Sequence, residues 1–353
     1  MGYEVKDGKG IIPDDIDVIS DRLLSCTRLE PIELSEGITV IAGEAFSGCT
    51  SLQSIVIPGS VTTIGREAFF NCKNLKSIEI PNSVTTIEES AFSRCTSLQS
   101  IVIPDSITEI AFEAFEGCTS LQSIEIPNSV TKIRESAFDN CTSLQSIIIP
   151  DSVTSLDGSA FAGCNNLTSI IVSKNNSEYK STNNCILSSD GKKLILCRNH
   201  NIPDSVTTIG WSAFSGCTSL QSIVIPDSVT TIGNMAFSDC TRLQSIEIPN
   251  SVTTIGNEAF LLCTSLQSIV IPDSVAVIGG GTFYNCTSLQ SITIATKEKD
   301  PDSFRKRTEY LLIILPIVAK DISLRVPIGC GYAYRHYPAF EGKFKTIIAD
   351  IDV

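Results

Sequence analysis

A period of 23 residues is the feature of this sequence that most restricts its fold. Cysteines recur at that spacing in two runs, which are separated by a single step of 53 residues. The recurring positions are Cys26, Cys49, Cys72, Cys95, Cys118, Cys141 and Cys164, then Cys217, Cys240, Cys263 and Cys286. A fixed period of about 20 to 50 residues indicates a solenoid, in which each repeat is one supersecondary unit stacked on the next.

Within one repeat, the apolar residues indicate how the chain turns. In the copy that begins at Cys49 they are Leu52, Ile55, Ile57, Val61, Ile64, Ala68 and Phe69. The L-x-x-I-x-I stretch alternates like a short strand, so Val56 should face solvent between two buried isoleucines. Pro58 lacks a backbone N–H and ends that strand. We predict that VTTIG turns the corner and that xxAFxxC forms a short helical turn. A single repeat cannot bury its own apolar face, whereas stacked repeats can.

The pattern C-x-x-L-x-x-I-x-I-P-x-S-V-T-x-I-G-x-x-A-F resembles the BspA-like type of leucine-rich repeat found in bacterial proteins, and about eleven copies fit it. The resemblance implies an α/β solenoid. This would be a right-handed superhelix with a parallel β-sheet on its concave face and short helical turns and loops on its convex face. We expect an N-terminal cap and half-repeat at 1–25, the solenoid at 26–294 with an irregular insertion at 173–201, and a C-terminal cap at 295–353. The opening YEVKDGKGII could form a hairpin with Asp7 and Gly8 in its turn.

The composition bears on the class of partner. A formal net charge of -13 argues against nucleic acid, whose affinity for proteins rests largely on lysine and arginine. It argues equally against an anionic membrane surface. The first residues contain no apolar run, so no secretion signal is visible. The longest apolar segment, 311–319, is far shorter than the roughly 20 residues that span a bilayer. We therefore expect no nucleic acid and no membrane insertion, and we favour a monomer.

The cysteines and histidines offer little chemistry. The sequence contains no C-x-x-C pair, so we expect the periodic cysteines to form a buried ladder of small apolar side chains and not a metal site. Cys185 and Cys197 flank a hairpin-like stretch with Asp190 and Gly191 at its turn, and a cross-strand disulfide between them remains an open alternative. The two histidines are far apart in the sequence, and no nucleophile, phosphate-loop or dinucleotide motif occurs in a suitable context. We predict no enzyme activity, no cofactor and no metal.

The outward strand position carries the most informative variation. Down the chain it reads Glu33, Val56, Glu79, Val102, Glu125, Ile148, Ile171, Val224, Glu247, Val270 and Thr293. Acidic and apolar residues alternate over much of this series. Rungs about 4.8 Å apart would place like charges too close together if every rung carried an acid. Alternation keeps an acidic face with less repulsion, but a duplicated two-repeat block could produce the same pattern by accident.

These observations favour a non-catalytic protein-binding module that makes multivalent contacts along its concave face. The proposed ligand-binding residues are Glu33, Gln53, Val56, Glu79, Gln99, Val102, Glu125, Gln145, Ile148, Gln221, Val224, Glu247 and Val270. A secondary site in the insertion comprises Tyr179, Lys192, Lys193 and Arg198. The family resemblance implies display on a bacterial surface and attachment to host matrix or cell-surface proteins.

Three other functions remain open. A cytosolic scaffold would bind its partners through the same multivalent contacts, and no leader is visible to exclude the cytoplasm. A β-helical polysaccharide lyase is disfavoured because basic residues are scarce on the repeats. An ice-binding solenoid is suggested by paired threonines such as Thr62 and Thr63. It is disfavoured because we expect those pairs to occupy a turn and not a flat strand.

Overall fold

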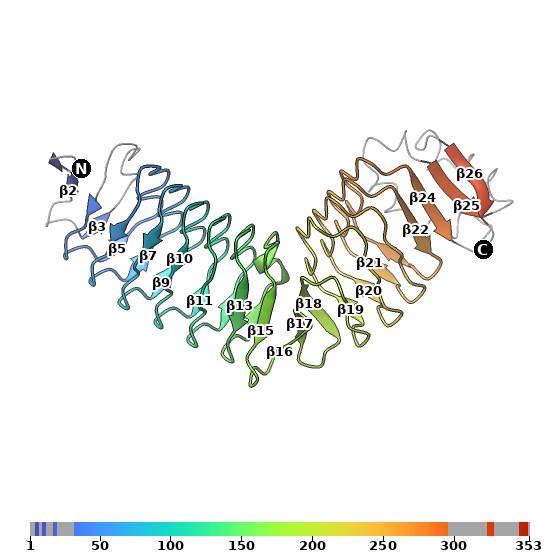
Figure 1. The fold of residues 1–353 in the computed structure, drawn as a ribbon, viewed down its shortest axis with the longest axis horizontal. Coiled ribbons are helices and arrows are strands. Elements are labelled where there is room, and N and C mark those ends of the chain that lie inside the picture. The colour runs from blue at the N-terminus through green and yellow to red at the C-terminus, as the bar shows by residue number, and fades with distance from the viewer. Residues whose placement is uncertain are drawn as a thin grey trace. The chain divides into compact units, whose positions relative to one another are not determined.

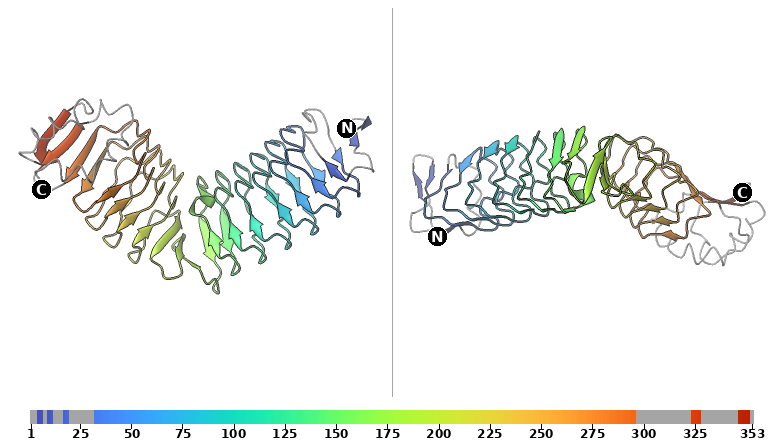
Figure 2. Two further views of the ribbon diagram at one scale, coloured as in Figure 1. Left: turned by 180° about the vertical axis from the view of Figure 1, so that it is seen from behind. Right: turned by 90° about the horizontal axis from the view of Figure 1, so that it is seen from below.

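The fold is described from a computed structural model, which defines residues 4–6, 9–11, 17–19, 32–295, 323–327 and 346–351. The chain divides into two compact units, Met1–Ile186 and Leu187–Val353. In each unit, strands of successive repeats lie side by side as short parallel arrows, as Figures 1 and 2 show. Two such rows of strands run through each unit, and we call them the first sheet and the second sheet.

The first sheet is built from the I-x-I stretches, as the alternation predicts. In unit 1 its strands are β4 (Ile32–Glu33), β6 (Ile55–Val56), β8 (Ser77–Ile78), β10 (Ser100–Ile101), β13 (Ser146–Ile149) and β15 (Ser169–Val172). The pairs β4–β6, β8–β10 and β13–β15 are parallel, with Ile148 opposite Ile171 in the last of them. Isolated bridges at Val56–Glu79, Val102–Glu125 and Ser123–Ser146 continue the same register. The predicted parallel sheet is therefore confirmed.

The second sheet corrects one prediction, because VTTIG is not a simple turn. In unit 1 its strands are β3 (Val18–Ile19), β5 (Val40–Ile41), β7 (Thr63–Ile64), β9 (Thr86–Ile87), β11 (Glu109–Ile110), β12 (Lys132–Ile133) and β14 (Ser155–Leu156). Thr63 pairs with Thr86 and Ile64 with Ile87 in parallel register. The second threonine of each pair therefore lies in a strand and the first precedes it, so our expectation that the pairs occupy a turn was wrong for the second threonine.

Unit 2 repeats both sheets. Its second sheet contains β18 (Lys193–Cys197), β19 (Thr208–Ile209), β20 (Thr231–Ile232), β21 (Thr254–Ile255) and β23 (Val277–Ile278). Its first sheet contains β22 (Ser268–Pro272), β24 (Ser291–Ala295), β25 (Ser323–Pro327) and β26 (Thr346–Ile351). A bridge between Val224 and Glu247 extends the first sheet to earlier repeats. The segments before β25 and before β26, including Leu311–Ala319 and most of the expected cap, lie outside the described residues.

The third side of each repeat corrects a second prediction, because xxAFxxC is not helical. Within the described residues, the helices reduce to one 3-10 turn, η1 (Gly158–Phe161). In the copy that begins at Cys49, Glu67 and Asn71 have φ values of 55° and 60°, and the equivalent residues of most other repeats are also left-handed. An α-helix needs a negative φ at every residue. These segments are consecutive turns, so the architecture is a β-solenoid and not an α/β solenoid.

The core lies between the two sheets and the turns. Leu52, Ile55, Ile57, Val61 and Ile64 are all buried, as the apolar pattern predicts. Phenylalanine rings stack from repeat to repeat in each unit, with centroids 5.1 Å apart for Phe46 and Phe69 and 5.0 Å apart for Phe214 and Phe237. Their planes lie within 10° of parallel. Each ring therefore packs on its neighbour, which is how one repeat completes the core of the next.

Polar side chains also join the repeats. The Cys72 thiol donates to the carbonyl oxygen of Phe46 at 3.1 Å, and Ser60 donates to Ile38 at 2.6 Å. Thr62 donates to the Thr39 carbonyl at 3.2 Å. Each bond runs from one repeat to the preceding one and has counterparts along the array. The ten described cysteines of the repeats are buried thiols, so the predicted core ladder is confirmed over those residues.

The strand pairing of the N-terminal hairpin is also confirmed, while Asp7 and Gly8 of its expected turn lie outside the described residues. β1 (Glu4–Lys6) pairs antiparallel with β2 (Lys9–Ile11), and β2 then pairs parallel with β4. Residues 20–31, including Cys26, lie outside the described residues. This hairpin joins the first sheet of unit 1 at its N-terminal end.

The insertion contributes further strands. They are β16 (Tyr179–Thr182), β17 (Cys185–Ser188) and β18. In unit 2, Asp190 accepts from the Lys192 amide at 2.9 Å and from the Ser188 hydroxyl at 2.6 Å. The predicted turn at Asp190 and Gly191 is therefore present. Cys185 and Cys197 are both disulfide-bonded, which agrees with the alternative left open by the sequence.

Candidate binding surface

The outward face of the first sheet carries exposed aliphatic side chains at one repeat position. Ten large hydrophobic side chains are exposed in the described residues, and six of them occupy this position. These six are Val56, Val102, Ile148, Ile171, Val224 and Val270. Val56, Val102 and Val224 are 77%, 73% and 83% exposed. These side chains thus recur at one strand position from repeat to repeat and are not scattered over the surface.

Carboxylates lie between these aliphatic residues. Glu79, Glu125 and Glu247 are exposed at the same strand position. Within the part of the chain that the structure describes, none of the three makes an ion pair or hydrogen bond through its side chain. Glu33 lies in β4 in register with Val56, although its side chain is outside the described atoms. The alternation of acidic and apolar rungs is thus present on one face.

Glutamines border this face, as the sequence predicts. Gln53, Gln99, Gln145 and Gln221 are all exposed, three residues before the outward position of their repeats. The Gln53 side-chain oxygen accepts from Lys76 at 3.2 Å. Backbone amides of this row pair from repeat to repeat, as in Gln99 to Lys76 at 3.2 Å. The glutamine side chains therefore form a regular polar edge beside the acidic and apolar rungs.

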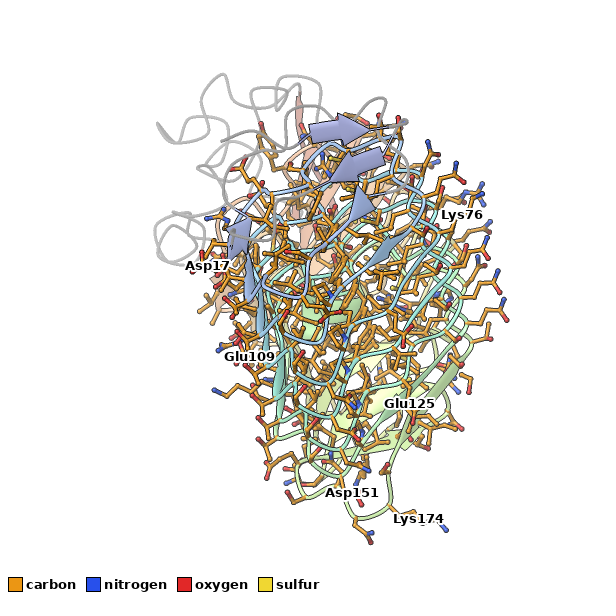
Figure 3. The ribbon with its side chains drawn as sticks, turned by 90° about the vertical axis from the view of Figure 1, so that its left-hand side faces the viewer. Asp17, Lys76, Glu109, Glu125, Asp151 and Lys174 are labelled. Carbon is orange, nitrogen blue, oxygen red and sulfur yellow. The ribbon has the colours of Figure 1, made fainter. Side chains whose placement is uncertain are left out.

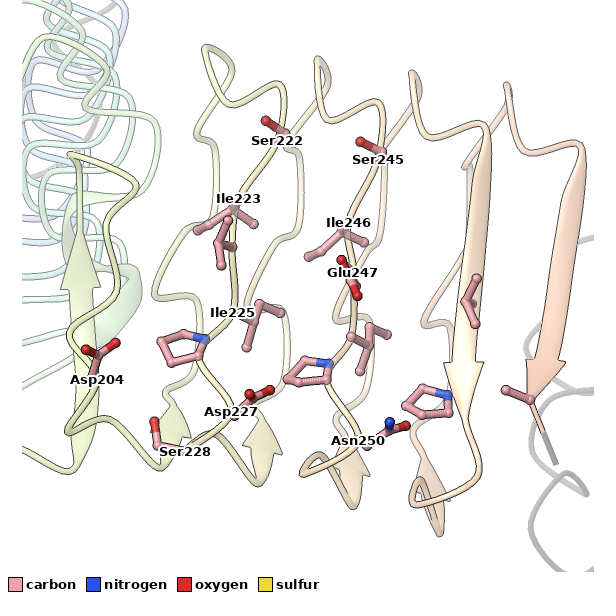
Figure 4. A pocket seen from close by; sticks show the side chains of 17 residues that line it. Asp204, Ser222, Ile223, Ile225, Asp227, Ser228, Ser245, Ile246, Glu247 and Asn250 are labelled. Atoms are coloured by element: carbon pink, nitrogen blue, oxygen red, sulfur yellow. The ribbon is translucent and has the colours of Figure 1, made fainter. Parts of the chain in front are cut away.

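In unit 2 the face contains a groove of about 1140 Å³. Figure 4 shows Asp204, Asp227 and Asn250 near the ends of neighbouring strand segments, with Ser222 and Ser245 near the opposite ends. Glu247 lies between these two rows. Val224, Val270, Pro272 and Ala295 complete the apolar part of its lining. This groove brings together the predicted Val224, Glu247 and Val270.

The aspartate and asparagine positions were absent from the predicted site. They follow the strand-ending proline, as in Pro226-Asp227 and Pro249-Asn250. The sequence did carry a signal. Asp follows a Val or Ile rung at Asp105, Asp151, Asp227 and Asp273, and Asn follows a Glu rung at Asn82, Asn128 and Asn250, whereas Gly59 follows Val56. In the repeats with Asp, the carboxylate therefore lies three residues after the outward strand position, beyond the proline. The acidic residues of the groove lining are Asp204, Asp227 and Glu247, which belong to three successive repeats.

The outward face of the second sheet differs in kind. Its smaller groove, about 410 Å³, is lined by Arg66, Glu88, Glu89, Glu109 and threonines. Glu109 accepts two hydrogen bonds from Arg134, at 2.6 Å and 3.2 Å, and Lys132 lies 4.0 Å away. The hydrogen bond and charge of Glu109 raise the pKa of Arg134. Figure 3 shows Asp17 and Glu109 on one side of unit 1 and Lys76 on the other. Several charges on the second sheet are thus partnered within the chain.

The residues of the predicted secondary site divide between the units. Tyr179 belongs to unit 1, where its half-buried hydroxyl accepts from the Leu156 amide at 2.9 Å. Burial raises the pKa of Tyr179. Lys192 and Lys193 are exposed in unit 2, and Arg198 donates to the Cys217 sulfur at 2.6 Å. Tyr179 and Arg198 therefore have structural contacts of their own, and the secondary site stays a prediction.

The described residues contain no group of three His, Cys, Asp or Glu side chains arranged to hold a metal ion. His200 is half-buried near Arg198, and both burial and that positive charge lower its pKa. The repeated serines and threonines donate to backbone carbonyls, as Ser152 does to Val130 at 2.7 Å. Among the described helices, none is long and apolar enough to cross a bilayer.

Comparisons with known proteins agree with this architecture. The BspA type leucine rich repeat region matches residues 9–76, 90–189 and 192–308, in 6 copies. The chain is similar to the crystal structure of a leucine rich cell surface protein from Faecalibacterium prausnitzii A2-165. The identity is 29%, the match covers 97% of this chain and 87% of that chain, and the TM-score is 0.68.

Two further structures share the fold. The pneumococcal vaccine antigen PcpA is 22% identical, with a TM-score of 0.68 over 89% of this chain and 85% of that chain. A leucine-rich repeat protein from Eubacterium ventriosum ATCC 27560 is also 22% identical, with a TM-score of 0.50 over 96% and 78%. No functionally curated protein matches the chain. Repeat proteins of this type are generally protein-interaction modules and not enzymes. Since the repeat family matches well over half of its residues, the chain belongs to the BspA type leucine-rich repeat family.

Proposed function

We propose that this protein is a non-catalytic adhesion module whose first-sheet face binds protein ligands at a bacterial cell surface. The observation that carries the proposal is the row of exposed aliphatic and acidic side chains at one repeat position. Burying an exposed valine contributes about 1.5–3 kcal/mol when the partner covers it completely. The exposed glutamates of this row have no side-chain partner within the described residues, and they can accept hydrogen bonds from a basic partner at little desolvation cost near the rim.

Multivalency follows from the repeats. Equivalent contacts recur along the face, so a long ligand can engage several rungs at once and gain avidity without one deep pocket. Aromatic anchors, which commonly dominate compact interfaces, do not occupy the outward first-sheet position of the described repeats from Val56 to Val270. The similarity to a cell surface protein of Faecalibacterium prausnitzii supports the location. Attachment to host matrix proteins is the form of adhesion we favour.

The experiment uses charge reversal on the first sheet. The triple variant Glu79→Lys, Glu125→Lys and Glu247→Lys is compared with the control variant Glu36→Lys, Glu89→Lys and Glu178→Lys. Both sets are exposed and change the net charge equally. Binding to an immobilised extract of mammalian extracellular matrix is measured by surface plasmon resonance. We expect the first variant to lose at least tenfold in affinity and the control to bind like the parent. Equal binding by both variants would place the contact surface elsewhere.

A further inference from the structure

The acidic positions of the first sheet have a spacing of two rungs. In unit 1, Glu79 and Glu125 stand on either side of the rung that carries Val102. Neighbouring parallel strands lie about 4.8 Å apart, so the two glutamates are separated by about 9.6 Å along the stack. Val102 is 73% exposed and lies midway between them. A ligand lying along the stack therefore meets an acid, an aliphatic side chain and an acid in turn.

Unit 2 has the same two-rung spacing with the residue types exchanged. Val224 and Val270 stand on either side of Glu247. Asp227 and Asn250 follow the proline of the first two of these rungs, and both line the groove. The period of about 9.6 Å therefore recurs from Val56 to Ile148 in unit 1 and from Val224 to Val270 in unit 2, and it ends in unit 1 where Ile171 follows Ile148.

A regular ligand must return the same face to the protein at this period. An extended β-strand does so every two residues, or about 6.6 Å. An α-helix presents one face every seven residues, or about 10.5 Å, and its backbone N–H and C=O groups are hydrogen-bonded to one another. A polyproline II helix has three residues per turn and a rise of about 3.1 Å per residue, so its face recurs every 9.3 Å or so. Of these conformations, polyproline II agrees best with two rungs.

The polar edge of the face also suits this conformation. A polyproline II backbone has no internal hydrogen bonds, so its carbonyl oxygens are free to accept from a partner. Gln99, Gln122 and Gln145 present exposed carboxamides on three successive rungs beside the acidic and apolar positions. An α-helix offers no equivalent acceptors along its length because its carbonyls are already bonded. The glutamine row thus gives the face donors that match an extended, unpaired backbone.

Charge determines the side chain that the ligand carries. Glu79, Glu125 and Glu247 have no side-chain partner within the described residues. A cation at every third residue of a polyproline II helix would meet one carboxylate per turn. The two intervening residues, at heights of about 3.1 and 6.2 Å, would straddle the exposed valine between the acids. Proline rings at those positions would cover it.

We infer that the first-sheet face binds a polyproline II helix that carries lysine or arginine at every third residue and lies along the stacking direction. This inference rests on the proposed function, since it names the ligand class for the same face. The ligand is a protein segment rich in proline with a basic triplet period.

The test uses two synthetic peptides of identical composition. One is (Pro-Pro-Lys)6, and the other contains the same twelve prolines and six lysines with lysine spacings that alternate between two and four residues. Binding of each fluorescein-labelled peptide to the full chain is measured by anisotropy in 50 mM and 150 mM salt. We expect the regular peptide to bind about tenfold more tightly, which corresponds to two surface ion pairs at the favourable end of their range.

A spacing variant separates register from charge. Val102→Glu combined with Glu125→Val keeps the composition and net charge but places two acids on adjacent rungs. The preference for the regular peptide should disappear in this variant, while circular dichroism and the melting temperature show that the fold persists. Equal affinity of the parent for both peptides would overturn the inference, as would a preference that survives the exchange.

The outcomes for the two proposals are distinguishable. If the peptides show no preference but charge reversal still abolishes binding to matrix extract, the adhesive face stands and the ligand class is wrong. If charge reversal leaves matrix binding unchanged, the proposed function itself fails.

Discussion

The thiol of Cys118 donates a hydrogen bond to the carbonyl oxygen of Phe92, 3.2 Å away in the preceding repeat. The same carbonyl accepts from the Cys95 amide, also at 3.2 Å. Cys118 is completely buried, so its side chain both fills the core and joins two repeats. Equivalent bonds connect Cys141 to Phe115 and Cys240 to Phe214. The 23-residue recurrence of cysteine therefore has a polar as well as an apolar cause.

Replacing this thiol should separate the two contributions. Cys118→Ala removes both the sulfur volume and the donor, and we expect a loss of about 1–3 kcal/mol in the free energy of unfolding. Cys118→Ser keeps a donor within reach of Phe92 and should lose less. The measurement is urea unfolding followed by circular dichroism. If the thiol acted only as an apolar group, the order would reverse, because serine would bury a hydroxyl that gains nothing.

Alkaline pH should destabilise the protein through these thiols. Burial raises the pKa of Cys118 and of Cys286 to about 12, from an ordinary value of 9.0. Below pH 9 the thiols are protonated in both the folded and the unfolded state, so their contribution to the free energy of unfolding is complete. Between about pH 9 and 12 the unfolded chain releases protons that the folded chain retains, so stability falls by roughly 1.4 kcal/mol per pH unit for each such thiol.

The check is the slope of unfolding free energy between pH 8 and 10 under reducing conditions. Cys118→Ser should have a shallower slope than the parent, by about one proton, above pH 9. Tyrosine and lysine titrate alike in both proteins, so the difference isolates the thiol. Parallel slopes would show that Cys118 does not hold its proton in the folded state.

Leu262 is strained by its backbone conformation. It has a φ of 59° at the residue before Cys263, where other repeats place Gly48, Gly117 or Asn71. A left-handed φ costs a leucine roughly 1–2 kcal/mol relative to glycine. Leu262→Gly relieves this strain but also removes a half-buried side chain, which offsets part of the benefit. The variant should therefore raise the free energy of unfolding by about 0.5–1 kcal/mol. Leu261→Gly, one residue earlier and without a positive φ, should lower it. The check is the melting temperature of each variant, and a lower melting temperature for Leu262→Gly would contradict the prediction.

Truncating a ring within the stack should be costly. Phe115 stacks on Phe92 and Phe138, with centroids 5.6 Å and 5.5 Å away. Phe115→Ala should cost about 3–5 kcal/mol in unfolding free energy, because it opens a cavity between two completely buried rings. Phe112→Ala, in the same repeat but exposed, is the matched control and should cost well under 1 kcal/mol. Calorimetry of the two variants provides the comparison, and similar losses would contradict the stacking.

The sequence predicted the repeat and its buried positions because those depend on short-range alternation. Ile55, Ile57, Val61 and Phe69 are all buried as expected. The alternation in I-x-I and the proline after it were sufficient to predict the strands of the first sheet. The position of Val56, Glu79 and Val102 on one solvent face followed directly from that strand.

The second sheet could not be predicted in the same way. Thr63 and Ile64 form a strand only two residues long, and its partners lie 23 residues away on either side. Local alternation therefore gives no signal, since the neighbouring repeats define the strand. The turn over xxAFxxC had a signal that we did not use. Gly48, Asn71, Gly117 and Asn140 precede the cysteines, and glycine and asparagine favour the left-handed φ found there.

The groove in unit 2 was predicted only in part. Val224, Glu247 and Val270 follow from the outward strand position, whereas Asp204 and Asp227 lie beyond the proline that ends the strand. The alternation of Asp and Asn after that proline was visible in the sequence. Whether those residues shared a face with the strand depended on the path of the chain after it, which no local pattern specified.

The most direct test of the central claim blocks one face at a time by chemical modification. Val102→Cys introduces an exposed thiol on the first sheet, and Thr108→Cys introduces one directly before β11 of the second sheet in the same repeat. The background carries serine in place of Cys26 and Cys330. The buried native thiols should not react with a polyethylene glycol maleimide. Binding to matrix extract is then measured by surface plasmon resonance. We predict that modification at position 102 abolishes binding and that modification at position 108 leaves it intact. Retained binding after modification at position 102 would contradict the account.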